Sequence, residues 1–71
     1  MFTFEKGKSY GTSGRGTITI LKRSAHYVTY TDGRDVAKKR TRRDLFGDVE
    51  YIIIPSGYPG MNYFCVADDA R

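Results

Sequence analysis

The strict alternation of side chains in the first half of this chain requires β structure there. Isoleucines alternate with threonines in residues 17–20, and Val28 and Tyr30 alternate with their neighbours in residues 27–31. A period of two is the signature of strands that bury one face. Asp32-Gly33 follows directly, and this pair favours a type I′ hairpin turn because both residues adopt positive φ at little cost. We therefore predict two paired strands and a third strand after the turn.

Further strands are predicted on both sides of this region. Residues 2–5 alternate as a short first strand with both phenylalanines inward, and residues 7–16 hold four glycines, which predicts a flexible loop or an irregular edge strand. The β-branched run 49–54 predicts the best-buried strand, which Pro55 ends, and residues 56–60 form a loop before a last strand at 61–67. The predicted core consists of Phe4, Ile18, Ile20, Val28, Ile52, Ile54, Phe64 and Val66.

Residues 35–46 fit two structures. As a strand after the Asp-Gly turn, they place Val36, Lys38, Arg40 and Arg42 on one face, and the charge on both faces suits a protected edge strand. As a helix, they have acidic caps and good helix formers but no continuous apolar stripe. We favour the strand, with a single turn at residues 44–46.

The size of the chain limits its architecture. Residues 1–71 suffice for a single small domain, in which about 60 per cent of the surface of the unfolded chain is buried. About five short strands in so short a chain are expected to curl into a closed or nearly closed barrel, or a strongly bent antiparallel meander. Because the core is small and the first and last strands are candidate open edges, we also expect a homodimer.

The chain has one cysteine, Cys65, and one histidine, His26, so an internal disulfide and the usual four-ligand zinc site are both excluded. A lone reduced cysteine, the lack of an apolar leader and the lack of any segment of about 20 apolar residues predict a cytoplasmic protein without a membrane span. No cofactor is expected, since Gly7-Lys8-Ser9 lacks the remaining glycine of a P-loop.

Catalytic constellations are also weak. Ser24 lies two residues before His26, but no third group in the sequence orients them, and Cys65 lies in an apolar strand that predicts a buried, inert thiol. The pair Asp68-Asp69 is typical of an exposed acidic terminus. We therefore predict a non-enzyme with no catalytic and no metal-ligating residues.

Charge is distributed unevenly along the chain. The net charge is +4, but residues 15–43 hold nine basic and two acidic side chains, a local charge of +7, whereas the remaining residues carry −3. A basic middle between acidic ends indicates an anionic partner, because lysines and arginines neutralise phosphates and release counterions. Six tyrosines and four phenylalanines offer additional stacking surfaces for bases.

Several short motifs stand out in the chain: Phe4-Glu5-Lys6-Gly7-Lys8-Ser9-Tyr10, Leu21-Lys22-Arg23-Ser24-Ala25, Asp32-Gly33-Arg34, Glu50-Tyr51-Ile52 and Gly57-Tyr58. Together they resemble small SH3-like barrel proteins of phages, plasmids and other mobile elements of gut bacteria. The resemblance implies an all-β, five-stranded SH3-like barrel and a mobile-element setting, and the group has largely no assigned function. The segment between Val36 and Val49 departs from the pattern by its extra basic and aromatic residues.

Two functions remain open from the sequence. The first is a module that binds nucleic acid, DNA or RNA, through a basic strand-and-loop surface. The second is an inhibitor or adaptor of a mobile element, similar in role to anti-CRISPR proteins, that binds an acidic surface of a host protein. In both cases the predicted binding residues are Lys22, Arg23, Tyr27, Lys38, Lys39, Arg40, Arg42 and Arg43.

Overall fold

The computed structural model describes residues 1–14, 16–44, 46–55 and 60–71, and these residues form one antiparallel sheet without a helix. Seven strands are present in the described residues, in place of about five predicted from the sequence. They are β1 (Ser9–Thr12), β2 (Thr17–Arg23), β3 (Tyr27–Thr31), β4 (Val36–Arg40), β5 (Arg42–Asp44), β6 (Val49–Pro55) and β7 (Asn62–Ala70).

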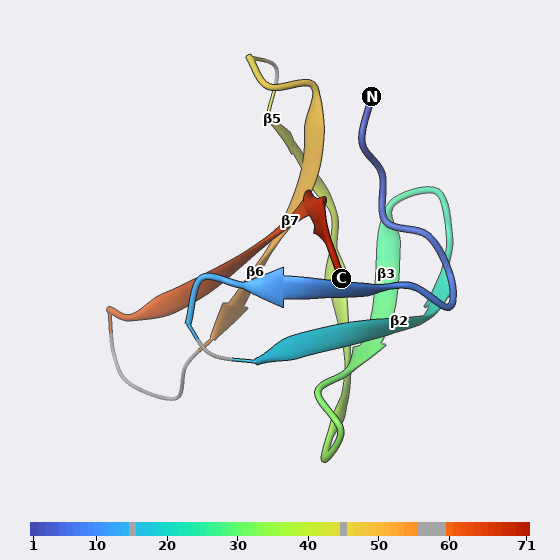
Figure 1. Ribbon diagram of the computed structural model, residues 1–71, viewed down its shortest axis with the longest axis vertical. Helices are drawn as coiled ribbons and strands as arrows, with labels where there is room; N and C mark the ends of the chain where they lie inside the picture. Colours follow the sequence, from blue (N-terminus) through green and yellow to red (C-terminus); the bar gives the residue numbers. More distant parts are fainter. Residues whose placement is uncertain (15, 45, 56–59) are drawn as a thin grey trace.

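The sheet is nearly closed into a barrel. The strand order is β4-β3-β2-β1-β7-β6-β5, so its two outermost strands are β4 and β5. These two strands are separated in the chain only by Thr41, whose amide donates a hydrogen bond to the His26 carbonyl at 2.9 Å. One bent segment therefore pairs with β3 through its first half and with β6 through its second half, which brings the ends of the sheet together (Figure 1).

The two additional strands have clear physical origins. The segment 36–44 is extended, as we favoured over a helix, but its bend at Thr41 divides it into β4 and β5. The glycine-rich segment contributes β1, because Tyr10 is buried in the core and Gly11 has no Cβ. A Cβ at Gly11 would lie 2.5 Å from the Asp69 carboxylate, so glycine lets β1 pack closely against the end of β7.

The predicted first strand is wrong. Residues 2–5 make a single parallel bridge, Phe2 with Val49, and Phe2 is 56% exposed while Phe4 is fully buried. The predicted loop at 56–60 falls mostly outside the described residues, as does Leu45 in the predicted turn at 44–46. The turn after β5 is nevertheless visible, since the Asp44 carboxylate accepts hydrogen bonds from the Phe46 and Gly47 amides.

The Asp-Gly hairpin is confirmed, but its turn differs from the prediction. Thr31 pairs with Val36, which leaves a four-residue connection in place of a two-residue type I′ turn. Only Gly33 has positive φ in this connection, while the Asp32 carboxylate accepts hydrogen bonds from the Arg34 and Asp35 amides, both at 2.9 Å. The aspartate side chain stabilises the loop in the way that a backbone turn would.

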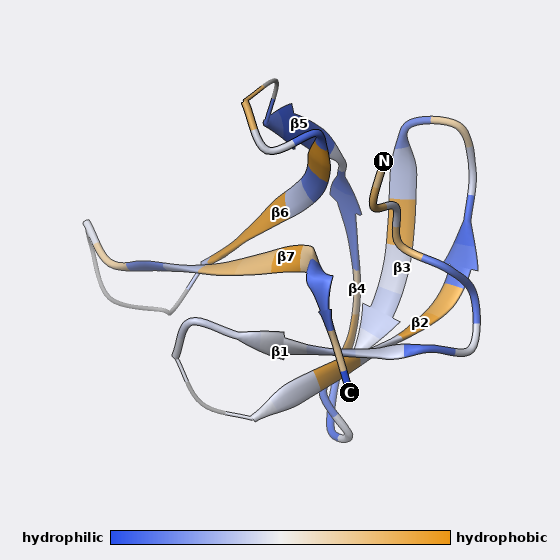
Figure 2. Cartoon of the chain, turned by 45° about the horizontal axis from the view of Figure 1, so that its top comes forward, coloured by the Kyte–Doolittle hydropathy of each residue, from blue (hydrophilic) through white to orange (hydrophobic). Residues whose placement is uncertain are grey.

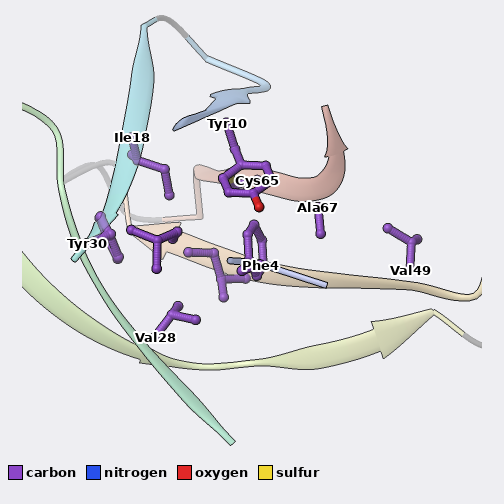
Figure 3. Packing of buried hydrophobic residues seen from close by; sticks show 10 residues of the cluster. Phe4, Tyr10, Ile18, Val28, Tyr30, Val49, Cys65 and Ala67 are labelled. Carbon is purple, nitrogen blue, oxygen red and sulfur yellow. The ribbon is translucent and has the colours of Figure 1, made fainter. Parts of the chain in front are cut away.

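The core lies inside the curved sheet, where Phe4 and Tyr10 meet edge to face with ring centroids 4.9 Å apart (Figure 3). Most of the predicted core is confirmed, with Ile54 and Val66 half-buried at its border, but Phe64 is 48% exposed. On β7 the buried positions are instead the smaller Cys65 and Ala67. No helix of the length and apolarity that a membrane crossing requires occurs among the described residues.

Candidate nucleic-acid interface

A β-bulge in β2 decides which basic side chains face outward. Ile20 pairs with Tyr30, and both are buried, so simple alternation would also turn Lys22 inward. The register shifts at Leu21, and Lys22 pairs with Thr29. The extra residue of a bulge reverses the alternation of the strand beyond it. Lys22 therefore lies on the outer side of the sheet, opposite the core.

Three adjacent strands then place their polar side chains in rows on this outer side. Lys22 of β2 pairs with Thr29 of β3, and Thr29 pairs with Lys38 of β4. In the neighbouring row Tyr27 of β3 pairs with Arg40 of β4. Because paired residues project to the same side of a sheet, these side chains are neighbours. We call this surface the basic face: Lys22, Tyr27, Thr29, Lys38 and Arg40.

Cations on the basic face are free to meet an anion. The Lys38 ammonium lies 5.0 Å from the centre of the Tyr27 ring, a cation–π contact, and within the described residues Lys22, Lys38 and Arg40 form no ion pair. A shallow groove of about 220 Å³ runs between Lys22 and Lys38, and none of the described residues that line it is acidic. Figure 2 shows that β4 becomes hydrophilic toward its end next to β5.

Arg23, although adjacent to Lys22, is placed inside the sheet. Its guanidinium donates hydrogen bonds to both carboxylate oxygens of Glu50, at 2.6 and 2.8 Å, and to the Phe4 carbonyl at 2.8 Å. Burial raises the pKa of Glu50, but the hydrogen bonds from Arg23 and from the Phe4 amide outweigh it, so that the net pKa lies below its usual value. Arg23 therefore stabilises the fold and is not free to bind phosphate.

The other predicted basic residues are distributed around the barrel. Lys39 pairs with buried Val28 and so lies on the inner side, where it lines a groove of about 430 Å³ with Asp32 and Asp35. Arg42 of β5 pairs with Tyr51 of β6, and Arg43 forms an ion pair with Asp48 at 2.7 Å. The structure thus brings together four of the eight predicted binding residues on the basic face, Lys22, Tyr27, Lys38 and Arg40. Arg23 lines the same groove but its guanidinium is paired with Glu50, and the other three lie elsewhere on the barrel.

Groups that could carry covalent chemistry are poorly placed for it. Burial, together with the Asp69 charge, raises the pKa of the Cys65 thiol to about 12, so the thiolate is scarce near neutral pH. His26 is exposed in the β2–β3 turn. Within the part of the chain that the structure describes, no three histidine, cysteine or acidic side chains gather as a metal site.

Sequence reasoning missed a second surface, on the outer side of β6 and β7, where Phe64 is exposed and its apolar neighbours are half-buried. Tyr51 pairs with Val66 and Ile53 pairs with Phe64, and this face is opposite the buried pair Ile52 and Cys65. We call it the apolar face: Tyr51, Ile53, Phe64 and Val66. The signal is present in the sequence, because a buried Cys65 requires that its two neighbours point the other way.

Comparison of the chain with protein-family models, with curated proteins and with solved structures finds no match.

Proposed function

We propose that this protein is a non-enzymatic binding module whose basic face binds the phosphate backbone of nucleic acid. The observation that supports this most strongly is the row from Lys22 through Thr29 to Lys38, with Arg40 in the next row. Three cations on one sheet surface repel one another, and within the described residues none has an acidic partner. A polyanion removes this repulsion and releases its own counterions.

The geometry of the basic face suits a backbone contact. Neighbouring strands lie about 4.8 Å apart, so Lys22 and Lys38, on strands separated by β3, are about 10 Å apart at the backbone. Both side chains are long and flexible and can contact one phosphate chain. Tyr27, 39% exposed and next to Lys38, offers a ring on which a base can stack. Such contacts carry little sequence information, so we propose binding with low sequence specificity.

The finer description of the fold that accompanies this proposal is an SH3-like barrel. It is supported by the single bent segment that forms β4 and β5 and contacts both ends of the sheet. The proposed mobile-element setting comes from the sequence resemblance alone, and the proposed cytoplasmic location rests on the single cysteine.

The test compares two double variants with the same net charge. Lys22→Ala/Lys38→Ala removes two cations from the basic face, and Lys6→Ala/Arg34→Ala removes two exposed cations elsewhere, so both lower the formal charge from +4 to +2. Affinity for a labelled mixed-sequence DNA oligonucleotide, single-stranded and duplex, and for the matching RNA is measured by fluorescence anisotropy. We expect at least a tenfold loss for the first variant and a much smaller loss for the second.

Equal losses in the two variants would show that only total charge matters, and full binding by Lys22→Ala/Lys38→Ala would contradict the proposal. Absence of binding by the parent protein at physiological salt would also contradict it and would favour an acidic host-protein surface as the target. Circular dichroism on all variants checks that the β fold is retained.

A further inference from the structure

We propose that the apolar face is the interface of a symmetric dimer, in which each copy covers the exposed Phe64 of the other. This inference is independent of nucleic-acid binding, because the apolar face and the basic face lie on different strands of the barrel. Phe64 is 48% exposed although it is the third residue of a nine-residue strand that is paired on both sides. The neighbouring Phe46, in the turn after β5, is fully exposed.

Two grooves border the Phe64 side chain. On the β6 side lies a groove of about 500 Å³, lined by Arg43, Asp44, Phe46, Val49, Tyr51, Phe64 and Val66. On the β1 side lies a groove of about 450 Å³, lined by Gly11, Thr12, Ser13, Phe64, Val66, Asp68 and Asp69. Phe64 and Val66 belong to both and form a ridge between them. The β6-side groove is lined mainly by apolar side chains. A second copy can therefore pack its own Phe64 ridge into this groove, and receive the ridge of the first copy in the same way.

Charges on the two flanks of this ridge have opposite sign. Arg42 lies on the β5 side, opposite Tyr51 in the register, and Asp68 lies on the β1 side. Within the described residues neither side chain forms an ion pair. A two-fold axis parallel to β7 places the Arg42 flank of one copy against the Asp68 flank of the other, twice in each dimer. Self-complementary contacts of this kind are what an isologous interface requires.

The same charges argue against other occupants. Asp68 and Asp69 line the β1-side groove, and none of the described residues that line it is basic, so this flank repels a phosphate backbone. Dimerisation through strand edges, which the sequence suggested, is disfavoured because β7 is paired on both sides, with β1 and with β6. The actual outer strand β4 carries three cations in its five residues, which oppose edge pairing with a second copy.

The apolar face consists of four side chains on two strands, so it is expected to be smaller than the roughly 800 Å² per partner of a standard interface. The dimer is therefore expected to dissociate in the micromolar range, and sedimentation velocity between 5 and 300 µM covers the transition. Phe64→Asp is expected to be monomeric throughout, whereas Val36→Asp, a substitution of an even more exposed apolar side chain on β4, is expected to dimerise like the parent.

A charge exchange gives a test that does not depend on removing apolar surface. Arg42→Asp and Asp68→Arg are each expected to dimerise less than the parent, because like charges then meet in both pairs. An equimolar mixture of the two variants is expected to regain dimer, since one chain is then acidic at both positions and the other is basic at both. A parent that stays monomeric at 300 µM, a Phe64→Asp variant that still dimerises, or a mixture without recovery would each overturn the proposal.

Discussion

Arg23 and Glu50 form a two-fold hydrogen-bonded ion pair at the border of the core, with Nη1–Oε1 and Nη2–Oε2 distances of 2.6 and 2.8 Å. The other two-fold pair among the described residues, Arg71 with Asp69, is exposed and longer, with both hydrogen bonds at 3.3 Å. The pair joins β2 to β6, and through the Phe4 amide and carbonyl it also holds the N-terminal segment against the core. Glu50 is the only buried charged residue in the described part of the chain, and its side chain is 8% exposed, against 25% for Arg23.

Loss of the arginine is expected to cost more stability than loss of the glutamate charge. Arg23→Met leaves a buried carboxylate without its cation, which costs about 3 to 5 kcal/mol. Glu50→Gln leaves the Arg23 guanidinium without its anion, but this group can turn toward water. Glu50→Gln is therefore expected to lower the free energy of unfolding by less than Arg23→Met. Lys22→Met, on the adjacent outer position, is the matched control and should change the free energy of unfolding by less than about 0.5 kcal/mol. Urea unfolding of the three variants measures their free energies of unfolding. Equal free energies for Arg23→Met and Lys22→Met would contradict the expected order.

Acid should destabilise the protein partly through Glu50. Because its pKa is lower in the folded state than its ordinary value of 4.5, the folded protein holds fewer protons there than the unfolded chain. The resulting stability is fully present above pH 4.5 and is lost as the pH falls through the lowered pKa. Asp32 and Asp48 also have lowered pKa values, from backbone amides and from Arg43 respectively, so Glu50→Gln should remove only part of the acid dependence. An unchanged pH profile in Glu50→Gln would disprove the assignment.

Cys65 should be almost unreactive while the protein is folded. With a pKa of about 12, roughly one thiol in ten thousand is ionised at pH 8, and the side chain is fully buried. Reaction with a disulfide reagent should therefore be slow in buffer and should become fast in denaturant. Fast modification of the native protein would show that β7 opens easily or that the thiol is accessible.

The β class, the hairpin after β3 and most of the core are predictable from alternation, because one buried face fixes the period of each strand. The bulge at Leu21 is not, since nothing in the local sequence marks the extra residue. For this reason the sequence predicts that Lys22 and Arg23 act together, although they face opposite sides of the sheet. On β7 the sequence favours the larger side chains as the inward ones, yet the crowded interior beside Phe4 and Tyr10 accommodates only Cys65 and Ala67.

The distribution of the basic residues around the barrel could not be predicted either, because it depends on which side of the sheet each strand position faces. The sequence predicts Lys39 and Arg43 on the binding surface because charge is usually exposed. Strand alternation turns Lys39 to the inner side of the sheet, and Arg43 lies on β5 at the other end of the sheet, where it is exposed and paired with Asp48. Ion-pair partners distant in sequence, such as Glu50 for Arg23, depend on how the sheet closes and cannot be obtained from local patterns.

The salt dependence of nucleic-acid affinity tests the central claim most directly. If Lys22, Lys38 and Arg40 each neutralise a phosphate, the logarithm of the association constant should fall linearly with the logarithm of salt concentration, at about 0.7 to 0.9 per contact. The slope should be the same for unrelated oligonucleotides and should decrease by about 1.4 to 1.8 in Lys22→Ala/Lys38→Ala, with no comparable change in Lys6→Ala/Arg34→Ala. A slope near zero, or one that the Lys22→Ala/Lys38→Ala substitutions leave unchanged, would contradict phosphate binding by the basic face.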